Sequence, residues 1–253
     1  MPDAAVNGRT IHYELRGEGT PLILLHGIGS SSRSWSRQLH GLSADFKVIA
    51  WDAPGYGGSS DPVGRPAMRY YADCLRGLVD ALGIHGFFLL GHSTGGVIAQ
   101  EFYRRNSQYV RKLILADTRF VGSKATLDDR LRAIRTTTPA EMAKQRAPKL
   151  LSRSAPRDLV DEVTEIMSAV RPAGYEFAAI ALAECDTRDV LNSLHVPTLL
   201  IWGSEDEITP VWNELPMGAR CEIISGAGHL CYIEQPDKFN GIVREFLRED
   251  HSS

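Results

Sequence analysis

A serine flanked by glycines is the clearest sign of chemistry in this sequence. Residues 91–95 read Gly-His-Ser-Thr-Gly, a match to the G-x-S-x-G pattern, between an apolar run at residues 87–90 and a helical pattern. A serine hydroxyl is a weak nucleophile unless a tight turn presents it to a base and to donors for the oxyanion it creates. The glycines at 91 and 95 leave room for such a turn, and Gly96 allows the following helix to approach the sheet closely. Ser93 is therefore predicted to be a nucleophile.

A carboxylate and a histidine that could activate this serine follow later in the chain. After the apolar run at residues 199–202 we favour Asp206 over the two neighbouring glutamates, because Thr209-Pro210 resembles the start of a helix. His229 follows the glycine-rich loop 226–228 and is predicted to be the base, with Asp206 fixing its tautomer. Asp117, at the end of an earlier apolar run, is the alternative acid.

Two backbone amides are the candidate donors to an oxyanion. Thr94 directly follows the nucleophile, and Ile28 lies in the loop after the first long apolar run. His26, His92 and Trp35 are candidates for substrate contact. For the two histidines the alternative is a structural role in shaping loops, and for Trp35 it is aromatic packing.

The surrounding sequence predicts an α/β fold with a mostly parallel sheet and helices on both faces. Short apolar runs alternate with amphipathic stretches, and runs covered on both faces read as near-continuously apolar. Asn7-Gly8 predicts a hairpin, so the sheet is expected to open with antiparallel strands. The core strands are expected at residues 22–25, 46–51, 87–90, 113–116 and 198–202, with a weaker one at 220–225.

Residues 118–193 interrupt this rhythm and are predicted to be a helical insertion, with residues 1–117 and 194–253 forming the core. Residues 119–157 contain ten Lys and Arg against three Asp and Glu, whereas residues 158–189 contain two against eight. Two interpretations remain open. Helical layers of opposite charge face each other or water, or the basic segment helps to hold an acidic substrate.

The chain resembles the α/β-hydrolases over nearly its whole length. The matching segments are the His26-Gly27 loop, residues 52–60, residues 91–96, Asp206 and Gly228-His229. The resemblance implies an α/β-hydrolase fold in which the helical insertion is a cap over the active site, and it implies catalysis without a cofactor. A nucleophilic aspartate, as in related dehalogenases and epoxide hydrolases, is excluded by Ser93.

A narrower resemblance suggests a substrate. Residues 171–175, 186–191, 226–230 and 234–236 are similar to the 3-oxoadipate enol-lactonase and carboxylesterase branch. This implies hydrolysis of a small carboxylic ester or lactone, with 3-oxoadipate enol-lactone as a candidate, and a role in aromatic degradation. Carbon–carbon hydrolases of ring-cleavage products usually show different residues at 28–32 and a Trp in place of Leu230. That activity, a cofactorless haloperoxidase or oxygenase, and a hydrolase-fold ligand receptor remain alternatives.

Composition excludes several other classes. The 253 residues are 43% hydrophobic and 23% charged with a net charge of −3, which is typical of a globular protein and gives no footprint for nucleic acid. No apolar run approaches the ~18 residues of a membrane span, and the first residues lack the features of a signal peptide. Histidines and cysteines form no metal motif. We therefore expect a cytoplasmic monomer or homodimer that acts on a small molecule, without a metal.

Overall fold

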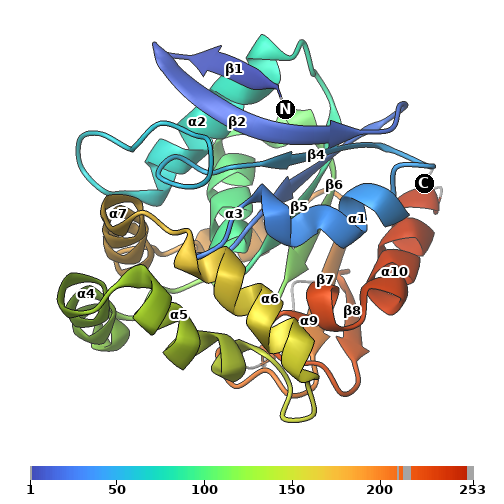
Figure 1. Ribbon diagram of the computed structural model, residues 1–253. Coiled ribbons are helices and arrows are strands. Elements are labelled where there is room, and N and C mark those ends of the chain that lie inside the picture. The colour runs from blue at the N-terminus through green and yellow to red at the C-terminus, as the bar shows by residue number, and fades with distance from the viewer. Residues whose placement is uncertain (1, 210, 213–217, 250–253) are drawn as a thin grey trace.

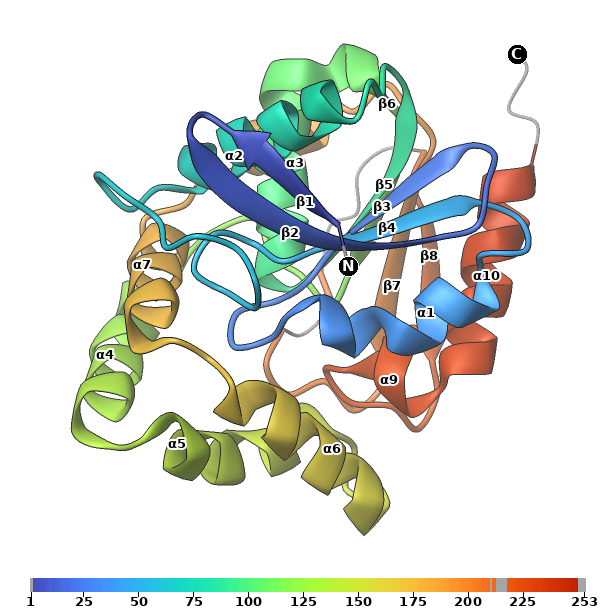
Figure 2. The same ribbon diagram turned by 45° about the horizontal axis from the view of Figure 1, so that its top comes forward.

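The computed structural model describes residues 2–209, 211–212 and 218–249, and its centre is one twisted sheet of eight strands (Figures 1 and 2). The spatial order is β1-β2-β4-β3-β5-β6-β7-β8. β1 and β2 are antiparallel to their neighbours, and all the other pairs are parallel. The expected mostly parallel sheet that opens with antiparallel strands is therefore confirmed.

The strands lie close to the apolar runs that predicted them. Their bounds are β1 Asp3–Val6, β2 Arg9–Arg16, β3 Pro21–Leu25, β4 Lys47–Trp51, β5 Phe87–His92, β6 Val110–Ala116, β7 Thr198–Gly203 and β8 Arg220–Ile224. The hairpin turn is also confirmed, because Asn7 and Gly8 both have positive φ and Val6 pairs with Arg9.

Helices cover both faces of the sheet. α2 (Met68–Ala81) and α3 (Thr94–Asn106) lie on one face, and α1 (Ser36–Gly41), α9 (Cys231–Glu234) and α10 (Pro236–Arg248) lie on the other (Figure 2). Alternate side chains of each strand enter opposite cores. In β3, for example, Ile23 packs toward α2 and α3, whereas Leu24 packs toward α1 and α10.

The chain between β6 and β7 is helical, as predicted. It contains α4 (Leu127–Thr136), α5 (Pro139–Arg146), α6 (Arg157–Ser168), α7 (Pro172–Ala183) and α8 (Arg188–Asn192). α4 to α7 lie together beyond one end of the sheet (Figures 1 and 2). β6 and β7 are themselves paired neighbours, with Leu113 opposite Thr198 and Ala116 opposite Ile201. The insertion therefore leaves the sheet at the carboxyl end of β6 and rejoins it at the amino end of the neighbouring strand β7.

The charged side chains of the insertion form ion pairs both within the insertion and with the core. Arg135 of the basic segment pairs with Glu176 of the acidic one. Two acids of α6 instead pair with the core, since Glu162 lies 2.6 Å from Arg37 and Glu165 lies 2.6 Å from Arg33. The acidic segment thus attaches the insertion to the core as much as it neutralises the basic segment.

No helix within residues 2–209, 211–212 and 218–249 is both long and apolar enough to span a membrane. The helix start expected at Thr209-Pro210 cannot be assessed, because Pro210 lies outside the described residues, as do residues 1 and 250–253 of the expected core.

Candidate active site

Ser93 occupies a sharp turn between β5 and α3. Its φ of 53° and ψ of −119° lie in a region that residues other than glycine rarely adopt, and such strain marks functional turns. Close packing enforces the turn. A Cβ on Gly91 would collide with the backbone of Gly95, and a Cβ on Gly95 would collide with the Leu25 carbonyl. Gly96 of α3 approaches the sheet closely, since a Cβ on Gly91 would lie 2.6 Å from Gly96 Cα. A Cβ on Gly96 would also collide with the Thr118 side chain, which donates a hydrogen bond to the Ser93 carbonyl.

Ser93, His229 and Asp206 form a continuous row of hydrogen bonds. His229 Nε2 lies 3.0 Å from Ser93 Oγ, and His229 Nδ1 lies 2.9 Å from Asp206 Oδ2. Because Nδ1 faces a carboxylate, it carries the proton, which leaves the Nε2 lone pair directed at the serine hydroxyl. His229 is only 4% exposed, so bulk water competes little for these bonds.

The carboxylate of Asp206 is held by several donors. Oδ1 accepts hydrogen bonds from the backbone amides of Ile208 and Thr209, and Oδ2 lies 2.5 Å from the Thr209 hydroxyl. Burial alone would raise the pKa of this carboxyl, but the bonds from His229 and Thr209 outweigh it and lower the pKa to about 2. Asp206 is therefore an anion at neutral pH. Thr209 was expected only to begin a helix, and its contact with the acid depends on a loop conformation that no sequence pattern specifies.

The alternative acid, Asp117, lies beside this row, with one oxygen within 4.8 Å of atoms of Asp206 and His229, but its carboxylate is hydrogen-bonded to other groups. It is fully buried, its Oδ1 accepts the Gly203 amide at 2.9 Å, and its Oδ2 lies 2.9 Å from Cys231 Sγ. Burial, and next the negative charge of Asp206, raise the pKa of Asp117 well above its ordinary value. Within the described ranges, Asp117, Asp206 and His229 are the three potential metal ligands that lie close together. Their atoms are already engaged with each other and with the backbone.

The expected oxyanion donors lie beside Ser93. Neither the Ile28 amide nor the Thr94 amide has an acceptor among the described residues, so both remain available to a ligand. His26 supports their loop through two hydrogen bonds, and it also lines a small hollow beside Ile28 and Thr94 that is distinct from the cavity above Ser93. Its Nδ1 donates to the Gly27 carbonyl at 2.9 Å, and its Nε2 accepts the Ala53 amide at 3.0 Å.

His92 adjoins His229 but lies outside the row of hydrogen bonds. Its Nε2 donates to the His229 backbone carbonyl at 2.7 Å. Burial, and next the proximity of His229, lower the pKa of His92 to about 3, so this ring is neutral at pH 7. His92 therefore positions the loop that carries His229, and it also lines the cavity above Ser93.

Comparison with known proteins agrees with this fold. Residues 22–242 match the model of the alpha/beta hydrolase family. The chain belongs to that family.

Individual members of the family differ in activity. This α/β-hydrolase is similar to the structure of a thermophilic esterase from Thermogutta terrifontis, with 29% identity, a TM-score of 0.91 and 99% of each chain covered. The structure of the enol-lactonase from Burkholderia xenovorans is 26% identical, with a TM-score of 0.88 and coverage of 98% of this chain and 100% of that one. The 2-hydroxy-6-oxo-6-phenylhexa-2,4-dienoate hydrolase of Comamonas testosteroni is 28% identical over 94% of this chain and 91% of that protein.

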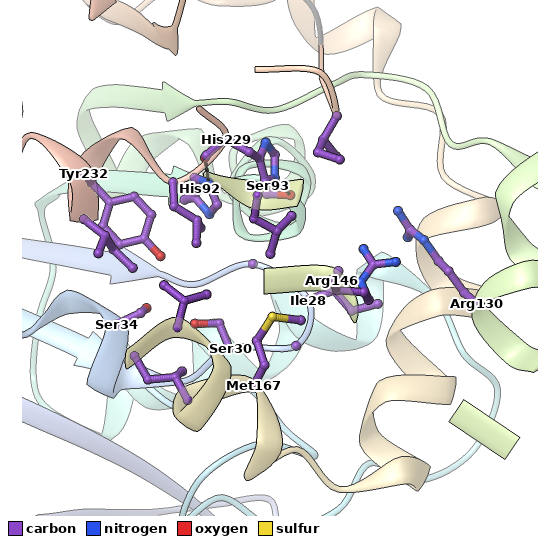
Figure 3. Close-up of a pocket in the computed structure, with 18 residues that line it drawn as sticks. Ile28, Ser30, Ser34, His92, Ser93, Arg130, Arg146, Met167, His229 and Tyr232 are labelled. Carbon is purple, nitrogen blue, oxygen red and sulfur yellow. Dashed lines mark hydrogen bonds between the residues drawn. The ribbon is translucent and has the colours of Figure 1, made fainter. Parts of the chain in front are cut away.

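A cavity lies above Ser93 in this α/β-hydrolase, enclosing about 540 Å³ together with its opening to solvent (Figure 3). Most of its wall is apolar and comes from the insertion and from the loops around His229. The lining residues are Gly27, Ile28, Gly29, Ser30, Ser34, His92, Ser93, Arg130, Arg146, Leu150, Val163, Ile166, Met167, Ile208, His229, Leu230, Tyr232 and Ile233.

Trp35 is not among the residues that line this cavity. It is fully buried and stacks on Tyr232, with ring centroids 4.1 Å apart, so it supports the wall from behind. Tyr232 reaches the cavity in its place. Of the three expected substrate contacts, only His92 faces this space, whereas Arg130, Arg146 and Tyr232 were not singled out from sequence.

The close packing at the turn predicts a stability effect for this α/β-hydrolase. Gly95→Ala is expected to lower the free energy of unfolding by about 1–3 kcal/mol or more, because the backbone that meets the new Cβ cannot move aside as a side chain could. Gly241→Ala in α10 is the matched control. No atom lies within 4 Å of the new methyl there, so a gain of about 0.5–1 kcal/mol is expected. Urea unfolding measures both, and equal effects would contradict the packing argument.

The lowered pKa of Asp206 predicts a pH dependence of stability. A carboxyl whose folded pKa lies below its ordinary 3.8 stabilises the fold above that pH and loses this contribution as pH falls toward its folded value of about 2. The stability difference between the wild type and Asp206→Asn should therefore shrink as pH is lowered from about 5 to 2. Denaturant titrations at each pH measure it. A difference that stays constant over this range would show that the folded carboxyl is not held ionised.

Proposed function

We propose that this α/β-hydrolase cleaves a small carboxylic ester or lactone through an acyl-enzyme. The observation that carries the proposal is the hydrogen-bonded row from Asp206 through His229 to Ser93, at the floor of a cavity and beside two amides with no acceptor among the described residues. Ester cleavage needs a nucleophile, a base and oxyanion donors together.

The proposed reaction has two halves. His229 Nε2 takes the Ser93 proton while Oγ bonds to the carbonyl carbon, and the amides of Ile28 and Thr94 stabilise the oxyanion. The carbon–oxygen bond of the leaving group then breaks, and His229 returns the proton to the departing alkoxide. In the second half, His229 deprotonates water, which attacks the acyl carbon. The bond between that carbon and Ser93 Oγ then breaks, the acid is released, and His229 returns the proton to Oγ. In a lactone the leaving oxygen remains tethered to the acyl group.

Residues 118–193 are proposed to act as a cap on the core formed by residues 1–117 and 194–253. This segment supplies one wall of the cavity, including Arg146, Val163 and Met167. A wall of this kind limits access of bulk water and selects the substrate.

The experiment that tests this proposal combines turnover with labelling. Purified protein is assayed with a 4-nitrophenyl ester, with 3-oxoadipate enol-lactone and with 2-hydroxy-6-oxo-6-phenylhexa-2,4-dienoate. A fluorophosphonate is expected to modify Ser93, as located by mass spectrometry. Rapid ester or lactone cleavage that the label abolishes supports the proposal, and rapid lactone opening would extend it to aromatic degradation. Exclusive cleavage of the dienoate would replace it with carbon–carbon hydrolysis, and no turnover of any substrate would refute it.

A further inference from the structure

Two arginines of the insertion, Arg130 in α4 and Arg146 in α5, line the cavity on one side of Ser93 (Figure 3). The side chains extend from different helices toward each other, while the hydroxyl groups of Tyr232 and Ser34 lie on the other side of the serine in this view. The cavity therefore has a cationic end, an apolar middle and a hydroxyl-bearing end. The reacting serine lies between the two polar ends.

Neither cationic group has a partner among the described residues. Arg130 and Arg146 are both half-buried, yet neither forms an ion pair or hydrogen bond there, and Arg146 Nε is completely shielded from solvent. Burial, opposed in part by nearby tyrosines and reinforced by the charge of Arg146, lowers the pKa of Arg130. Enclosing two like charges together without counter-ions costs free energy.

Other half-buried arginines of this protein have partners within the fold. Arg37 pairs with Glu162 through two hydrogen bonds, Arg244 pairs with Asp45, and Arg220 contacts three glutamates. Arg9 and Arg119, also half-buried, donate to the backbone carbonyls of Asp61 and Ile208. Each of these guanidinium groups therefore has a partner within the fold. The contrast indicates that the partner of Arg130 and Arg146 comes from outside the fold.

We infer that the substrate carries a carboxylate, separate from the bond that is cleaved, and that Arg130 and Arg146 bind it. A guanidinium fork matches a carboxylate in charge and in planar geometry. A bound carboxylate would neutralise the cationic end and fix the distance from the anchor to the scissile carbonyl, so that Ser93 meets only one part of the molecule. The substrate assignment rests on the proposed hydrolase function, whereas the anion site itself does not.

Paired esters test the substrate assignment. 4-Nitrophenyl pentanoate and the mono-4-nitrophenyl ester of glutaric acid differ in a terminal methyl against a carboxylate, and 4-methylphenyl and 4-carboxyphenyl acetate make the same comparison in the leaving group. In at least one pair, kcat/KM is expected to favour the carboxylated ester, and Arg130→Gln or Arg146→Gln should reduce that preference about 10- to 100-fold. The neutral ester of each pair is the reference within each variant, so that a general change in activity cancels from the ratio.

Arg132→Gln is the matched control. Arg132 also lies in α4, but it is exposed and close to Asp129, so its loss should leave the preference unchanged. Arg130→Lys should restore part of the preference, since it keeps the charge and loses the fork. Thermal unfolding serves as a check on folding, and because Arg130→Gln removes an unpaired half-buried cation, Tm is expected to stay constant or rise.

Calorimetric titration with glutarate separates this inference from the hydrolase proposal. Glutarate is expected to bind the wild-type protein, more weakly at high salt, and to lose about 10- to 100-fold in affinity in either arginine variant. Such binding without turnover of any ester would refute the hydrolase proposal and support the anion site. Turnover of neutral and carboxylated esters at equal kcat/KM, with glutarate binding absent or equal in the variants, would overturn the anion site and leave the hydrolase proposal standing.

Discussion

Replacing Ser93 with alanine is expected to lower the rate of ester hydrolysis by about 10⁶-fold, because the acyl-enzyme can no longer form. The remaining groups, His229 and the two amides, can still orient a substrate and polarise its carbonyl, so a small residual rate above that in water should persist. The measurement is single-turnover hydrolysis of an activated ester at high enzyme concentration, together with loss of fluorophosphonate labelling.

A serine at the other end of α3 provides the control. Ser107 lies exposed at the C-terminal end of α3, far from the row of hydrogen bonds, and Ser107→Ala should keep the full rate. A Ser93→Ala protein that stays folded and retains more than about one hundredth of the wild-type rate would contradict an acyl-enzyme mechanism.

Asp206→Asn is expected to reduce kcat by about 10⁴-fold. An asparagine can present its amide nitrogen to His229 Nδ1, which then favours the tautomer whose proton faces Ser93 and cannot accept the serine proton. It also removes the negative charge that stabilises the imidazolium. Steady-state kinetics should show the loss in kcat with little change in KM, because Asp206 does not line the cavity.

Asp117→Asn is the comparison that makes this prediction specific. Burial, and next the charge of Asp206, raise the pKa of Asp117 well above its ordinary value, which favours the neutral carboxyl that asparagine resembles. A much smaller loss than for Asp206→Asn is expected. Asp206 is preferred as the acid because its Oδ2 lies 2.9 Å from His229 Nδ1. Equal losses in the two variants would show instead that the two carboxyls act as a unit.

The order of the strands and helices could be predicted from the sequence because each pattern lies within a short stretch of the chain. A parallel strand covered on both faces is apolar at every position, and this specifies β3, β5 and β7 without knowledge of their neighbours. The positions of Ser93 and His229 were equally accessible, since each follows a strand and is set among glycines. Such patterns fix where a side chain leaves the sheet, and the sheet then brings the ends of its strands together.

The cavity wall was harder to predict because it depends on how the insertion packs. Counting charges identified a basic segment but not which arginines turn inward. Helical phase contained that information: Arg130 lies three residues after Leu127 and four before Ile134, on the apolar side of α4. Arg146 likewise lies four residues after the buried Met142. An arginine on the apolar side of a helix is the signal that composition alone obscures.

Trp35 was expected to contact the substrate, but it lies in the core. A large aromatic residue near the first loop was a reasonable candidate for ligand contact, but aromatic side chains bury large areas and usually do so in the core. Nothing local distinguishes Trp35 from Tyr232, which is separated from it by almost the whole chain and becomes its stacking partner only in the folded protein.

The adjacency of β6 and β7 has a consequence for how new selectivity can arise in this scaffold. Because the two strands are parallel, the excursion runs from Ala116 at the carboxyl end of β6 back to Thr198 at the amino end of β7, and its length can change without altering the register between the strands. The entropic cost of lengthening such an excursion grows only with the logarithm of its length. Recombination could therefore replace the whole helical segment and so change the wall of the cavity. The sheet and the positions of Ser93, Asp206 and His229 would stay the same.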